Sequence, residues 1–89
     1  MQAPHLSDIV SPDQQRQFNA AIDQSLSRAE ASLAAIGNRQ LSKDQLGLVE
    51  QIRNFMKQAQ AARSSDLPGA KSLAQRAEVL AKDLAGSFR

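Results

Sequence analysis

The sequence predicts an all-α fold, an up-down-up antiparallel three-helix bundle with a short N-terminal arm. Three observations predict it. The 89-residue chain is rich in alanine, leucine and glutamine and has only three aromatic residues, and such side chains lose little rotamer freedom in a helix. Apolar residues recur at spacings of three and four along most of the chain. Three segments begin with helix-capping signals, so we expect one bundle over residues 11–86.

Residues 1–10 lack helical periodicity and are predicted to form the arm. Pro4 biases the residue before it away from the helical region. The last residues, 87–89, follow a glycine and are expected to be a tail, in which Phe88 either folds back on the bundle or is frayed.

The first helix is predicted over residues 12–36. Ser11 stands at the N-cap, Pro12 at the first helical position, and Gln14 completes a capping box. A glycine, Gly37, follows the last apolar residue, and glycine accepts the left-handed conformation that often ends a helix. One apolar stripe runs between these signals: Phe18, Ile22, Leu26, Ala29, Leu33 and Ile36.

The second helix is predicted over residues 43–64. Ser42 and Gln45 form another capping box, and Leu41 and Leu46 occupy the positions of a hydrophobic staple. Its apolar face is wide, as expected for a helix that contacts two neighbours. The members of this face are Leu48, Val49, Ile52, Phe55, Met56, Ala59 and Ala62.

The third helix is predicted over residues 67–85, with Asp66 as N-cap and Gly86 as its stop. Its apolar residues follow a heptad pattern. One row holds Ala70, Ala77 and Leu84, a second holds Leu73 and Leu80, and a flanking row holds Ala74 and Ala81. The connections before and after the second helix are short, which implies antiparallel neighbours.

The composition excludes most site chemistry. The chain has no cysteine, which excludes disulfides and thiolate metal sites. Its formal net charge is only +2, and its charges are mixed along the chain without a basic block that would indicate a nucleic-acid-binding tail. His5 is the one histidine, and it falls in the arm without a rigid partner. The carboxylates are explained by helix starts or by pairs such as Glu50–Arg53 and Glu78–Lys82. We therefore expect no enzyme activity, metal, cofactor or small-molecule ligand.

The cations of the second helix, Arg53, Lys57 and Arg63, are interpreted as a solubilising surface because no aromatic residues interleave with them. No apolar run is long enough to span a membrane. The first residues lack the basic and apolar regions of a signal peptide. We expect a periplasmic or lipoprotein-anchored domain if a signal sequence has been removed, and a cytoplasmic one otherwise.

Residues from about 40 to 84 resemble alanine-rich helical hairpins of uncharacterised bacterial envelope proteins and lipoproteins. The resemblance lies in Ala62, a short polar turn with Asp66, and then the pattern Ala70, Leu73-Ala74, Ala77. It implies an extracytoplasmic helical domain without an assigned function.

A second resemblance is to the periplasmic chaperones with LTxxQ motifs. Residues 41–45, Leu-Ser-Lys-Asp-Gln, match that motif with serine in place of threonine, and residues 10–14 match it more loosely. This resemblance implies a helical, non-enzymatic protein that binds unfolded clients.

Taken together, the residues favour a non-catalytic helical interaction or scaffold module that binds a protein partner or self-associates. A client-binding chaperone and an accessory domain of an enzyme are the alternatives. The partner-binding residues are predicted on the wide face of the second helix, at Leu48, Val49, Phe55 and Met56, because three helices of this length need not cover all of that face.

Overall fold

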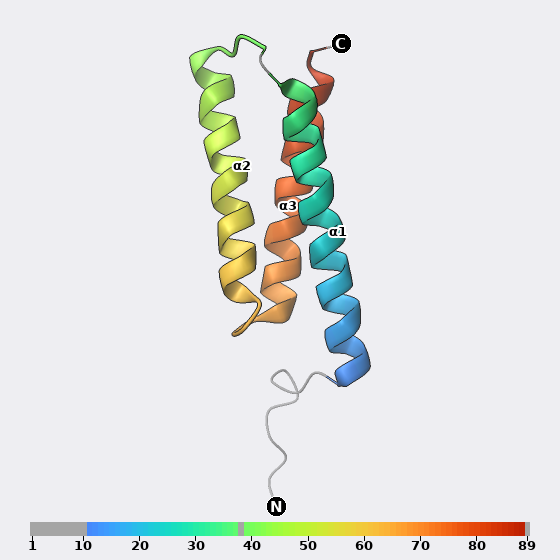
Figure 1. Ribbon diagram of the computed structural model, residues 1–89. Coiled ribbons are helices and arrows are strands. Elements are labelled where there is room, and N and C mark those ends of the chain that lie inside the picture. Colours follow the sequence, from blue (N-terminus) through green and yellow to red (C-terminus); the bar gives the residue numbers. More distant parts are fainter. Residues whose placement is uncertain (1–10, 38, 89) are drawn as a thin grey trace, which may run out of the picture.

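A computed structural model describes residues 11–37 and 39–88 of the chain. Over these residues it consists of three α-helices: α1, Pro12–Ile36; α2, Lys43–Ala62; and α3, Leu67–Gly86. The helices run alternately up, down and up, with α3 between and behind the other two (Figure 1). The predicted all-α three-helix fold is confirmed. The arm predicted over residues 1–10, with His5, lies outside the described residues, as does the final residue of the tail.

Local side-chain hydrogen bonds explain where each helix begins. The Gln14 amide donates to Ser11 Oγ at 3.1 Å, and the Ser11 amide donates to Gln14 Oε1 at 3.2 Å. Ser42 and Gln45 repeat this capping box at 3.1 and 2.8 Å. At α3 the Asp66 carboxylate accepts from the Gly69 amide at 3.0 Å. Each cap satisfies amides that the first helical turn leaves without partners.

The three helices end in different ways, whereas all three begin with a side-chain cap. Gly37 ends α1 with φ 58°, a left-handed value that favours glycine. The second helix ends at Ala62, two residues before its predicted end, because the Ser65 and Asp66 amides turn back to the Ala62 carbonyl. Helix α3 includes Gly86, and the Ser87 hydroxyl donates to the Leu84 carbonyl at 2.6 Å to close its last turn.

Helix α3 is the shared partner of the other two helices. Both α1 and α2 pack extensively on α3, while they make little contact with each other. The α3 residues at this double interface have no exposed surface and are Ala70, Ala74, Ala77 and Ala81. Their short side chains allow two helices to approach one backbone closely. Leu73 and Leu80, predicted as a core row, are only half-buried, whereas the predicted flanking row, Ala74 and Ala81, is fully buried.

Burial is uneven among the helices. Helix α1 buries most of its predicted stripe, with Phe18 half-buried at the lower end. Helix α2 buries only Ile52 and Ala59. The core has an upper cluster, which includes Ile36, Ile52 and Leu84, and a lower cluster, which includes Ile22, Leu26 and Ala59. The staple residue Leu41 packs against the upper cluster, but its partner Leu46 is 51% exposed. The wide apolar face predicted for the second helix is therefore only partly covered by the bundle.

Polar contacts tie the flanks of α3 to its neighbours. Lys71 lies over the Phe18 ring of α1 at 5.6 Å, and Arg76 lies over the Phe55 ring of α2 at 5.7 Å, both within the range of cation–π attraction. Glu78 of α3 accepts from Arg28 of α1 at 3.3 Å. The predicted pairing of Glu78 with Lys82 is thus replaced by an ion pair between helices.

The α3 cap makes a specific prediction for Gly69. A Cβ atom at this position would overlap the Asp66 carboxylate, whereas a Cβ at Gly47 would meet nothing within 4 Å. Alanine is favoured over glycine inside a helix by about 1 kcal/mol, and loss of an N-cap costs about 1 kcal/mol. We expect Gly47→Ala to raise the free energy of unfolding by about 0.5 to 1 kcal/mol, and Gly69→Ala to give no gain or a loss. Urea denaturation followed by circular dichroism measures both. Equal gains at both positions would contradict the proposed cap geometry.

Candidate functional site

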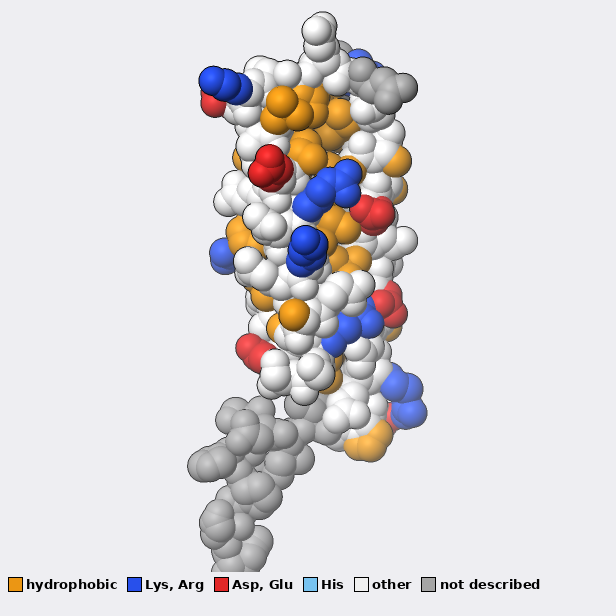
Figure 2. Space-filling view, turned by 60° about the vertical axis from the view of Figure 1, so that its left-hand side comes forward, with side chains coloured by type: hydrophobic (Ala, Val, Ile, Leu, Met, Phe, Trp, Pro, Cys, Tyr) orange, Lys and Arg blue, Asp and Glu red, His pale blue; other side chains and the backbone are white. Residues whose placement is uncertain are grey.

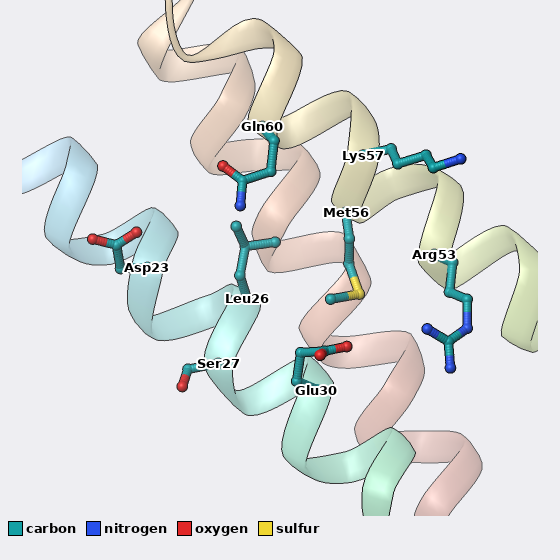
Figure 3. Close-up of a pocket in the computed structure, with 8 residues that line it drawn as sticks. All are labelled: Asp23, Leu26, Ser27, Glu30, Arg53, Met56, Lys57 and Gln60. Carbon is teal, nitrogen blue, oxygen red and sulfur yellow. The ribbon is translucent and has the colours of Figure 1, made fainter.

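The packing of α1 and α2 on α3 leaves a groove between α1 and α2, which we call the α1–α2 groove. Its volume is about 520 Å³, and side chains from only these two helices line it (Figure 3). The lining residues are Asp23, Leu26, Ser27 and Glu30 of α1 and Arg53, Met56, Lys57 and Gln60 of α2. The groove exists because α3 separates the two helices that form its walls.

The floor of the groove is apolar. Leu26 of α1 and Met56 of α2 point into the space between the helices, and Gln60 extends toward Leu26 from above (Figure 3). Leu26 belongs to the lower core cluster, and Met56 packs against both clusters. The floor is therefore the outer surface of the core itself, held by the packing of the bundle.

Apolar residues continue this floor toward the connection between α1 and α2. Residues seven apart lie on the same side of a helix. Val49 precedes Met56 by seven residues, Leu46 precedes Arg53 by seven, and Leu33 follows Leu26 by seven. Figure 2 shows hydrophobic side chains in an interrupted upright strip, with basic side chains over and beside it and acidic side chains on both of its sides. The candidate surface thus extends beyond the eight lining residues.

The two edges of the groove carry opposite charges. Asp23 and Glu30 stand on the α1 edge, and Arg53 and Lys57 stand on the α2 edge. The Arg63 guanidinium, at the end of α2, forms an ion pair with Asp23 across the lower end. Among the described residues, Glu30, Arg53 and Lys57 have no ion-pair partner within 4.0 Å. These three charges are available to a bound molecule.

The four residues predicted to bind a partner lie on two sides of α2. Met56 lines the groove, and Val49 lies on the same side of the helix. Phe55 faces the opposite flank, beneath Arg76 of α3, and Leu48 lies seven residues before it on that flank, 36% exposed. The structure therefore groups Val49 and Met56 with α1 and separates them from Leu48 and Phe55.

The prediction from sequence missed the contribution of α1 to this surface. Apolar periodicity places Leu26 in the stripe of the first helix and does not single out Asp23 or Glu30. Arg53 and Lys57 were interpreted as a solubilising surface. One signal was present in the sequence: Asp23 and Glu30 are seven residues apart and flank Leu26 on one side of the helix.

The described residues contain no group of three or more histidine, cysteine, aspartate or glutamate side chains that could hold a metal ion. Within the same part of the chain, every helix is too short or too polar to cross a membrane. Comparisons with protein-family models, with curated proteins and with solved structures found no match for this chain.

The Asp23–Arg63 ion pair gives a prediction about the lower end of the groove. Both side chains keep contact with solvent, at 67% and 26% exposure, so we expect a coupling free energy of about 0.2 to 1 kcal/mol that decreases with salt. A double-mutant cycle with Asp23→Asn and Arg63→Gln, measured by urea denaturation, tests this. The more exposed Asp13–Arg16 pair is the matched control and should couple less. Zero coupling at low salt would show that the pair does not join α1 and α2.

Proposed function

We propose that this chain is a non-catalytic helical interaction module that binds a protein partner in the α1–α2 groove. One observation carries the proposal. Helices α1 and α2 pack on α3 and scarcely on each other, so an apolar floor stays open between two charged edges. A site with an apolar centre and a polar rim is typical of surfaces that bind proteins.

The chemistry of the floor supports a protein partner. Met56 is half-buried, and methionine has a flexible, polarizable side chain that adapts to different apolar contacts. Leu46 is 51% exposed beside the same strip. A bound apolar side chain would remove this surface from water, and that burial is the main favourable contribution to most protein association.

We also propose an extracytoplasmic location for this domain. The resemblance of residues 40–84 to helical hairpins of bacterial envelope proteins supports an extracytoplasmic location. The resemblance to LTxxQ chaperones has a local explanation, because Ser42 and Gln45 form the capping box of α2. We therefore favour a module with a defined partner over a chaperone of unfolded clients.

A peptide-display selection against the folded domain tests the proposal. We expect binders whose affinity decreases about tenfold or more with Met56→Lys, because the substitution places a charge at the centre of the floor. Val79→Lys is the matched control, since Val79 is 56% exposed on α3 and does not line the groove. It should change affinity less than about twofold.

Methyl chemical shifts of the wild-type protein provide a second measurement that does not depend on the stability of a variant. Bound peptides should shift the methyl resonances of Leu26 and Met56 and leave those of Val79 unchanged. A selection without binders, or binders that shift only residues outside the groove, would contradict the proposed function.

A further inference from the structure

We infer that the occupant of the α1–α2 groove is one amphipathic helix of a partner protein, with acidic residues on its flank against α2 and a basic residue on its flank against α1. The inference rests on the proposed function and names the kind of partner. It is drawn from the shape of the groove, the spacing of its apolar residues and the signs of its edge charges.

The shape fits a single helix. Two helices that both pack on a third form the walls, and a fourth helix seated between them would contact both walls, as in a four-helix bundle. Asp23 and Glu30 are seven residues apart on α1, which is about 10 Å along the axis. A helix of about three turns would therefore cover the edge charges and continue along the floor toward Leu46.

The apolar residues of the floor repeat at the spacing that a helix requires. Leu26 and Leu33 on α1 and Val49 and Met56 on α2 are each seven residues apart. A partner helix with an apolar stripe places side chains at the same repeat. Its apolar side chains would contact Leu26 and Leu33 on the α1 wall and Val49 and Met56 on the α2 wall.

The edge charges define the flanks of the partner helix. Arg53 and Lys57 are four residues apart on α2, about 6 Å along the axis, and no described carboxylate pairs with them. Two acidic residues one turn apart on the partner would lie opposite them. Glu30 on the other edge would lie opposite a lysine or arginine. Because reversing a helix exchanges its flanks, this charge pattern also selects one direction of binding.

A second copy of this chain fits the groove less well. The large apolar side chains of the described helices mainly face α3, and the outer side of α3 carries Val79 among the exposed polar residues Ser72, Gln75 and Asp83. A copy would therefore have to present its own groove, and two concave surfaces do not fill each other. The inference accordingly names a separate partner.

The test uses three fluorescent peptides of about 14 residues, stapled to hold the helix because short helices are marginal in water. All carry the same leucine stripe. One has an acidic and a basic flank, one has glutamine on both flanks, and one has basic residues on both flanks. We expect the mixed peptide to bind about three- to tenfold more tightly than the glutamine peptide, and the fully basic peptide to bind more weakly than either. The preference should shrink between about 0.05 and about 0.5 M NaCl.

A charge reversal on the protein sharpens the test. The double variant Arg53→Glu with Lys57→Glu makes both edges acidic, so the fully basic peptide should become the tightest of the three. The double variant Lys43→Glu with Lys82→Glu is the matched control, since it changes the net charge equally at exposed positions outside the groove. It should leave the order of the peptides unchanged.

The outcomes separate this inference from the proposed function. Equal affinity for the mixed and glutamine peptides, or no binding by any of the three, overturns the inference, and the display selection still decides independently whether the groove binds proteins. Light scattering that finds a dimer of the wild type, lost in the Arg53→Glu and Lys57→Glu variant, also overturns it, because the occupant is then a second copy. Preference for the mixed peptide, reversed only by the groove variant, is the result expected.

Discussion

The structure depends on the close approach of two helices to one row of alanines. Ala70, Ala74, Ala77 and Ala81 have no exposed surface, and each contributes only a methyl group to the interface. Larger residues from the neighbours, Ile22 of α1 and Ile52 of α2, are fully buried and belong to the same core clusters as these alanines. Since interiors pack to nearly constant density, the small residues of α3 and the large residues of its neighbours are complementary. Both neighbours therefore pack on α3 in preference to each other.

The groove follows from this arrangement and is held by it. The Lys71–Phe18 and Arg28–Glu78 contacts fix α1 on one flank of α3, and the Arg76–Phe55 contact fixes α2 on the other. These three contacts lie outside the groove, and the Asp23–Arg63 ion pair joins its two walls at the lower end. A surface that is already in shape before binding costs less ordering entropy on association. The same packing that stabilises the fold therefore prepares the proposed binding surface.

Local features of this chain can be predicted from sequence, and the candidate site cannot. Ser11 and Ser42 cap their helices through contacts three residues away, so a short pattern contains all the information needed. The groove depends on which helix becomes the shared partner, which no local pattern specifies. Periodicity indicates that the face of α2 is wide, but it does not show that Met56 would face α1 while Phe55 faces the far flank. For the same reason the sequence shows Arg53 and Lys57 only as surface charges. The structure shows that they line a groove whose other edge carries Glu30.

The central claim is that α1 and α2 share α3 and remain open toward each other. Methyl-resolved NOE spectroscopy of a protein labelled at alanine, isoleucine, leucine and methionine tests it most directly. The alanine methyls of α3 should show NOEs to side chains of both α1 and α2, with few NOEs directly between α1 and α2. Equally dense NOEs among all three helix pairs would indicate a closed bundle without a groove and would contradict this arrangement.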